Sequence, residues 1–218
     1  SLVGVINADL ADVALVSSGA TANFADKNVG TGKTVTVAAS SLGLTGAMAT
    51  NYEIVTHPTT IADITVKAVT VSGITANNKV YDGTTTAALT TSNVAFNGIE
   101  SGDSLSLQSI TGTFAGKDVV ISGGNPSAQV VTFSNSVFGG ADVGNYSFTP
   151  QATSSATITP KAMSISGLSA DSRVYDGTRV AAVTNTNAVF NVLVLGDVVT
   201  VSATGVFDDK NVGIAKTV

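Results

Sequence analysis

Two nearly identical hexapeptides lie 94 residues apart in this chain of 218 residues: KVYDGT spans residues 79–84 and RVYDGT spans residues 173–178. A catalytic signature is rarely duplicated within one small enzyme, whereas a turn that every copy of a repeated domain needs is duplicated together with the domain. The duplication therefore predicts a tandem repeat. It also favours a structural role for the hexapeptide over a catalytic one.

Two further blocks return in the same order. FADKNVGTGKTV at 24–35 returns as FDDKNVGIAKTV at 207–218, and a degenerate version, FAGKDV, stands at 114–119. A third block pairs NYEIV at 51–55 with NYSFT at 145–149, each beginning with Asn-Tyr. Because the middle FAGKDV version lacks the Asn-Val-Gly of its neighbours, a strict catalytic or metal-binding role for this block is disfavoured.

The order of the blocks divides the chain into three parts. We expect one complete repeat at 67–160, preceded by the C-terminal part of a first repeat at 1–66. The N-terminal part of a third repeat follows at 161–218. The complete repeat is about 94 residues long, within the usual range for a domain.

Hydrophobic residues within the repeat recur every second position. Val69 and Val71 alternate with polar residues, and Met163 and Ile165 do the same in the next copy. Alternation of this kind marks half-buried strands, and turn residues punctuate it about every 8–12 residues. The pattern predicts an all-β fold of tandem antiparallel β-sandwich-like (immunoglobulin-like) repeat domains.

The Val-Tyr-Asp-Gly-Thr stretch predicts a tight hairpin turn in each copy. Gly83 can take the positive φ that such a turn requires, and Asp82 can accept a hydrogen bond from a backbone N–H two residues later. Tyr81 supplies an apolar ring whose hydroxyl can bond to the backbone. A Tyr–Asp proton-transfer pair is the functional alternative, which the repetition disfavours. The counterparts in the next copy are Tyr175, Asp176 and Gly177.

All four tyrosines of the chain stand at repeated positions. Tyr52 corresponds to Tyr146, as Tyr81 corresponds to Tyr175. Tyrosines of a core or a turn repeat in this way, whereas catalytic tyrosines need not. We therefore expect all four to have structural roles.

Composition narrows the possible partners. The chain is 44% hydrophobic but only 11% charged, against about a quarter in ordinary globular proteins. Its net charge of −5 is thinly spread, which argues against a nucleic acid partner. No apolar run approaches the roughly 20 residues of a membrane span. The absence of cysteine fits a reducing cytosol or an exported bacterial protein that avoids disulfides.

Few residues offer catalytic or metal-binding chemistry. His57 is the only histidine, so the sequence provides no histidine triad or zinc cluster, and we expect it on the surface. Asp26, Asp208 and Asp209 are weak candidates for a Ca²⁺ site, because no dense Asp-x-Asp-x-Asp loop surrounds them. We expect no cofactor and no required metal.

Two other chemistries are weighed and disfavoured. A Lys–Asn isopeptide bond from Lys67 or Lys161 to Asn145 would need a buried acid beside the pair, which the sequence does not identify. A glycosidase would need two opposed carboxylates in a cleft, and small β-units without a long insertion leave little room for one. We therefore do not expect an enzyme.

The ordered combination of KVYDGTT, FADKNVGTGKTV and the Asn-Tyr block, with ATITPKA leading into the next Tyr-Asp-Gly, resembles a known family. It is similar to the YDG/MBG-type repeats of large bacterial surface and secreted adhesins, which include filamentous-haemagglutinin-like proteins exported by two-partner secretion. The resemblance covers the whole chain. It implies an extracellular or cell-surface bacterial β-domain that serves as a stalk or spacer.

We therefore expect a non-enzymatic structural repeat region, a stalk, spacer or fibre-forming segment of a bacterial extracellular adhesin with a role in cell adhesion or biofilm. The alternative is a ligand-binding β-module for a glycan or protein of the host or matrix, whose identity the sequence does not reveal. A glycan site needs exposed aromatic rings, and Phe133, Phe138 and Phe148 are the candidates.

The expected partners are the neighbouring repeats of the same chain. By alignment, 1–66 lacks the opening strands of its repeat and 161–218 lacks the closing strands. An incomplete repeat exposes an open sheet edge, which recruits another strand. Either the true domain is offset from 67–160, or identical chains pair head to tail, a contact that propagates into fibres.

Overall fold

The computed structural model describes residues 2–218, in which the extended secondary structure is entirely β. Its four helices are single 3₁₀ turns of three residues, and among the described residues no helix could cross a membrane. They are η1 (Asn7–Asp9), η2 (Ala39–Ser41), η3 (Ala49–Asn51) and η4 (Val143–Asn145). The all-β class predicted from the sequence is confirmed.

The first repeat forms two small antiparallel sheets. Its strands are β1 (Ala14–Val16), β2 (Ala22–Phe24), β3 (Gly30–Val37), β4 (Gly43–Thr45) and β5 (Thr59–Ile64). One sheet has the order β2-β3-β5, and the other pairs β1 with β4. Val13 is its only buried hydrophobic residue among 2–66.

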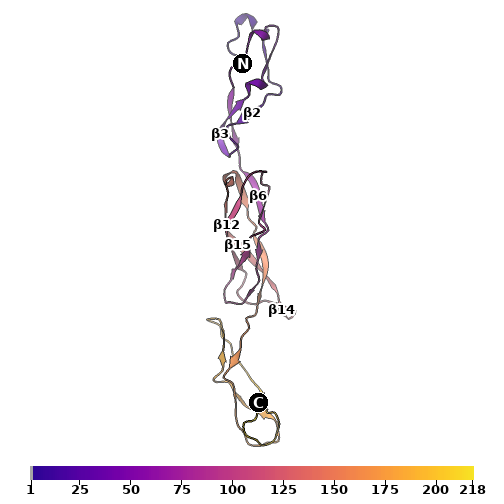
Figure 1. Cartoon of the computed structure of the whole chain (residues 1–218), viewed down its shortest axis with the longest axis vertical. Coiled ribbons are helices and arrows are strands. Elements are labelled where there is room, and N and C mark those ends of the chain that lie inside the picture. Colours follow the sequence, from indigo (N-terminus) through magenta and orange to yellow (C-terminus); the bar gives the residue numbers. More distant parts are fainter. Residues whose placement is uncertain (1) are drawn as a thin grey trace. The chain divides into compact units, whose positions relative to one another are not determined.

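The middle repeat contains most of the sheet. Its strands are β6 (Lys67–Ser72), β7 (Thr75–Ala76), β8 (Lys79–Val80), β9 (Thr86–Ala87), β10 (Leu89–Thr90), β11 (Ala95–Asn97), β12 (Ser106–Phe114), β13 (Ile121–Ser122), β14 (Asn125–Pro126), β15 (Ala128–Gly139), β16 (Tyr146–Thr149) and β17 (Thr153–Thr159). A five-stranded sheet has the order β8-β17-β15-β12-β9, and its long central strands β15 and β12 are marked in Figure 1. A three-stranded sheet has the order β11-β6-β16.

Two strand pairs of the middle repeat are parallel, which the antiparallel expectation does not include. β17 runs parallel to β8, with Ile158 opposite Lys79, and β16 runs parallel to β6, with Phe148 opposite Val69. Parallel neighbours need a long connection between them. Here the body of the repeat is that connection, because its last strands return beside its first ones.

The core lies in the middle repeat, which holds ten of the twelve buried hydrophobic residues of 2–218. The period of two produces it: in β15, Gln129, Val131 and Phe133 point inward while their neighbours are exposed. The one polar member, Gln129, donates from Nε2 to the backbone oxygen of Asp118 at 2.7 Å. A buried polar group is tolerated when it is hydrogen-bonded in this way.

The third repeat forms three two-stranded ladders, β18-β22, β19-β21 and β20-β23. The bounds are β18 (Ile165–Ser166), β19 (Ser169–Ala170), β20 (Val180–Ala181), β21 (Val183–Thr184), β22 (Val189–Phe190) and β23 (Gly205–Val206). Met163 and Ile165 are 43% and 38% exposed, whereas their counterparts Val69 and Val71 are buried. In the middle repeat β16 pairs with β6, the strand that carries Val69 and Val71, and 161–218 contains no counterpart of β16.

By contacts, the chain divides into two compact units. The first comprises 1–73, 93–110 and 135–151, and the second comprises 74–92, 111–134 and 152–218. The junction between the first and middle repeats lies inside the first unit. The junction between the middle and third repeats lies inside the second.

Candidate functional site

The aspartate and glycine of the YDG turn shape it locally. Asp82 Oδ1 accepts hydrogen bonds from the backbone N–H and the hydroxyl of Thr84, both at 2.9 Å. Gly83 has a φ of 77°, a conformation that only glycine adopts without strain. The next copy repeats the arrangement, with 2.8 Å from the Thr178 N–H to Asp176 Oδ1. The turn chemistry expected from the sequence is therefore present in both copies.

The turn does not, however, form the expected hairpin. β8 pairs with β17 and β9 pairs with β12, so the turn joins the two opposite edge strands of the five-stranded sheet. The hairpin prediction is wrong because the partner of β8 comes from the far end of the repeat. An exposed sheet edge can recruit a strand from another chain. In this repeat the turn connects the two edge strands, β8 and β9, to each other.

Lys79, the first residue of the motif, links the two edges. Its Nζ donates to Asp82 Oδ1 and to the Thr84 backbone oxygen, both at 2.7 Å. It also donates to the backbone oxygen of Thr86, in β9, at 3.1 Å. The ammonium lies 5.4 Å from the centre of the Phe114 ring, and 16% of the Lys79 side chain is exposed. Lys79 therefore links the two edge strands of the sheet through side-chain hydrogen bonds.

Arg173 makes the corresponding contacts within the turn of the third repeat. Its guanidinium pairs with Asp176 and donates to the Thr178 hydroxyl at 3.0 Å. It also lies over a phenylalanine ring, 5.4 Å from the centre of Phe207. The sequence comparison showed a cation at the start of both hexapeptides but assigned it no function. Tyr175, by contrast, is 57% exposed.

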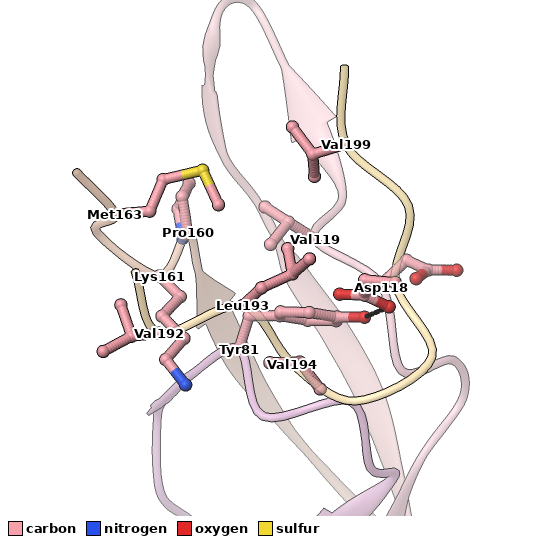
Figure 2. Close-up of a pocket in the computed structure, with 11 residues that line it drawn as sticks. Tyr81, Asp118, Val119, Pro160, Lys161, Met163, Val192, Leu193, Val194 and Val199 are labelled. Atoms are coloured by element: carbon pink, nitrogen blue, oxygen red, sulfur yellow. Dashed lines mark hydrogen bonds between the residues drawn. The ribbon is translucent and has the colours of Figure 1, made fainter. Parts of the chain in front are cut away.

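Tyr81 reaches from the middle repeat to the third. Its hydroxyl donates to Asp197 Oδ1 at 3.0 Å and accepts from Lys117 Nζ at 3.2 Å. Figure 2 shows its ring among apolar side chains that include Val119 and Leu193, beside a cavity of about 310 Å³ lined by both repeats. The hydroxyl was expected to bond to the backbone, and it bonds to a carboxylate of the next repeat instead.

The tyrosines of the Asn-Tyr block each hold an aspartate of their own repeat. Tyr146 is buried, and its hydroxyl donates to Asp103 Oδ2 at 2.7 Å while accepting from the Glu100 N–H at 3.0 Å. Tyr52 donates to Asp9 Oδ2 at 2.8 Å and accepts from the Ile6 N–H at 3.1 Å. Asp9, Asp103 and Asp197 are spaced 94 residues apart, a repeated acid that sequence reasoning missed.

The loop of the FADKNV block joins the first repeat to the middle one. Lys27 Nζ lies 2.5 Å from Asp103 Oδ1 and 2.8 Å from Asp142 Oδ1. The Val29 N–H donates to Asn145 Oδ1 at 2.9 Å, next to these ion pairs. In the sequence this lysine stands next to Asp26. The structure places its partners in the next repeat.

The charges of this junction are mutually stabilised. The hydrogen bonds from Lys27 and Tyr146 lower the pKa of Asp103, and those from Lys27 and the Ser104 N–H lower the pKa of Asp142. The same two carboxylates, Asp103 first, raise the pKa of Lys27. Their side chains are 11% and 13% exposed, whereas that of Lys27 is 63% exposed. The ammonium thus reaches from solvent onto a nearly buried acid pair.

The three aspartates considered for calcium have lysine partners. Asp26 pairs with Lys33, and its Oδ1 accepts from a backbone N–H at 2.8 Å. Lys216 lies 3.2 Å from Asp208 and 2.6 Å from Asp209. Among the described residues no group of three or more metal-binding side chains is found. An ammonium therefore supplies the positive charge at these acids.

The corresponding loop of the middle repeat has a different structure. Its FAGKDV block has Gly116 at the position of Asp26, and it lacks a counterpart of Lys33, the lysine that pairs with Asp26. A short β13–β14 hairpin follows the block. Gly123 and Gly124 at its tip have φ values of 58° and 81°. Successive positive φ values are those of a tight hairpin turn, which explains the Gly-Gly-Asn-Pro insertion seen in the sequence.

The phenylalanines considered for glycan binding are not freely exposed. Phe133 is buried, and Phe138 and Phe148 are half-buried and stacked with their ring centres 4.3 Å apart. Phe96 packs edge-on against both rings. These side chains belong to the packing of the repeat.

The residues considered for other chemistry also have structural partners. Lys67 pairs with Glu100, while the Asn145 amide bonds with the loop of the first repeat. His57 is exposed, with Nδ1 3.3 Å from both a backbone N–H and a carbonyl oxygen. Lys67 and Asn145 are thus engaged separately, without a hydrogen bond to each other.

Comparison with known proteins identifies the family of the repeats. The model of the YDG domain family matches three times in tandem, at residues 1–61, 65–155 and 159–218. Neither a search of curated proteins nor a search of solved structures found a match. The matches together cover nearly the whole chain, and the chain belongs to the YDG domain family as three tandem repeats.

Proposed function

We propose that this chain is a non-enzymatic structural repeat region, a stalk or spacer of a bacterial extracellular adhesin. The observation that carries the proposal is where the motif residues find their partners. Lys79 and Asp82 bond within their own repeat, and Tyr81 bonds to the repeat that follows. Side chains engaged in this way stabilise the repeat and its junction, and they are not presented to a substrate.

Stretching of single molecules tests the spacer role. A spacer must hold its length under load, and the middle repeat, with the large core, is the part built to do so. Its unfolding should appear as a discrete event that releases roughly 30 nm of chain, the extended length of about 94 residues. Extension without any such event would contradict the proposal.

Surface labelling tests the location. Antibodies raised against this chain should bind intact cells of the bacterium that makes it, and treatment of those cells with an external protease should remove the signal. Binding only after the cells are permeabilised would refute an extracellular role. An antibody against a cytosolic protein serves as the control for cell integrity.

Head-to-tail pairing of identical chains is a more specific proposal within this function. It rests on the parallel pairing of β16 with β6, in which a late strand of the middle repeat lies beside its first strand. The same two strands of different copies have the complementary edges for this pairing. Sedimentation of the chain at rising concentration should then show growing assemblies, and a monomer at every concentration would contradict it.

A further inference from the structure

The junction between the first and middle repeats has the features of a docking site. A lysine enters from one repeat, and two aspartates that are nearly buried receive it in the next. Both aspartates are held in place by their own repeat, Asp103 by the Tyr146 hydroxyl and Asp142 by the Ser104 N–H at 2.9 Å. The acid pair is therefore oriented independently of Lys27.

The turn that presents the lysine is also preformed. The Asn28 N–H donates to Asp26 Oδ1 at 2.8 Å, which folds the Asp-Lys-Asn sequence back on itself. The third repeat carries the same turn, with 2.6 Å from the Asn211 N–H to Asp209 Oδ1. Lys210, the counterpart of Lys27, has no hydrogen bond or ion pair within residues 2–218.

The receiving side recurs as well. The Asp9–Tyr52 pair in the first repeat matches the Asp103–Tyr146 pair in the middle repeat, at 2.8 and 2.7 Å. One difference separates them, because Met48 stands where the middle repeat has the second acid. A receiving site of the first-repeat type thus offers one carboxylate to a lysine, and one of the middle type offers two.

We propose that the Asp-Lys-Asn turn is a binding element for another YDG repeat, and that the turn at 209–211 docks a further repeat of the middle type through Lys210. Continuity with the observed junction identifies the partner: the turn at 26–28 already binds such a repeat through Lys27 and Asn28, and the turn at 209–211 has the same three residue types. Charge agrees, since an exposed lysine meets a pair of acids. The proposal goes beyond a spacer function and holds whether or not the chain belongs to an adhesin.

The experiment places the third repeat's loop in the first repeat of the full chain. The loops at 24–29 and 207–212 differ only at the second residue, so Ala25→Asp converts one into the other. Because the chain has no cysteine, spin labels can be attached to Ser18→Cys and Ser147→Cys alone, one in each repeat. The distance distribution between the labels then reports docking.

We expect one narrow distance in the parent chain and in the Ala25→Asp variant. Lys27→Met should lose the narrow distance, because it removes the ammonium that pairs with both aspartates. The middle copy's loop, introduced by Asp26→Gly with Asn28→Asp, should lose it too, because it removes the carboxylate that holds the turn.

Lys210→Met is the matched control and should leave this distance unchanged. Circular dichroism of each variant should match that of the parent, because Lys27 is exposed and lies outside the core. A narrow distance that survives Lys27→Met would overturn the proposed docking site. Loss of the distance in Ala25→Asp would show that the third repeat's loop does not fit the site, and would overturn its assignment as a binding element.

Discussion

Replacing Lys79 with methionine should destabilise the middle repeat more than any other single lysine substitution in it. Methionine keeps the length and the apolar contact with the Phe114 ring, and it removes the ammonium that links β8 to β9. The change therefore separates the hydrogen bonds from the packing. It leaves the two edges of the five-stranded sheet without their link.

The magnitude follows from the geometry. A hydrogen bond to a charged group contributes about 1.5–3 kcal/mol, and Lys79 forms four contacts of 2.7–3.1 Å. Most of its acceptors belong to exposed residues, Thr84 and Thr86, so water can replace part of the loss. We therefore expect Lys79→Met to lower the free energy of unfolding by about 2–3 kcal/mol in total.

Urea unfolding, followed by tyrosine fluorescence or by hydrogen exchange of β15 and β17, measures the loss. Lys67→Met is the control, because Lys67 is 47% exposed and pairs only with the exposed Glu100, a contact of less than about 1 kcal/mol. Lys79→Arg should change the free energy of unfolding little, since Arg173 makes the corresponding turn contacts with Asp176 and Thr178 in the next repeat. If Lys79→Met costs no more than Lys67→Met, the closing role is refuted.

Three further predictions concern the turns. Gly177→Ala should lower the free energy of unfolding by about 1 kcal/mol, because residue 177 has a positive φ. Gly83→Ala should lower it further, because the added Cβ would also lie 2.7 Å from Val194 Cγ1. Equal losses of protection in hydrogen exchange would contradict this difference. Val192 has a φ of 60° where the middle repeat has glycine, so Val192→Gly should raise the free energy of unfolding of the third repeat by about 1 kcal/mol and move its urea midpoint upward; an unchanged midpoint would disprove the strain. The motif lysine and the turn N–H lower the pKa of Asp82 from 3.8 to about 2. The ionised Asp82 therefore stabilises the fold fully above about pH 4, and this stabilisation is lost as the pH falls toward 2. Because the side chain is half-exposed, the contribution amounts to less than about 1 kcal/mol. Asp82→Asn should remove this part of the pH dependence of the urea midpoint, and an unaltered profile would contradict the prediction.

Local features of the fold were predictable from the sequence. The alternation along β15 marks its inward side chains, and the positive φ of Gly83 follows from the turn sequence. Both depend on interactions within a few residues, to which propensity and periodicity respond. The repeat division is equally accessible, because three blocks recur in a fixed order.

Contacts between distant segments were not predictable from one sequence. Ile158 pairs with Lys79 across most of a repeat, and this pairing is what turns the expected hairpin into a link between sheet edges. Lys27 meets Asp103 at a separation of 76 residues, and no local pattern marks the two as partners. The one available signal was the recurrence of Asp103 at the 94-residue spacing, together with a cation in each loop.

Hydrogen exchange of the whole chain, resolved by residue, tests the central claim most directly. The claim is that 67–160 is one cooperative repeat whose motifs close it and join it to its neighbours. Strongly protected amides should fall in β6, β12, β15 and β17 and open together, while 1–66 and 161–218 exchange faster because each has one buried hydrophobic residue. Equal protection across all three repeats, or separate opening of 67–73 and 74–92, would contradict the account.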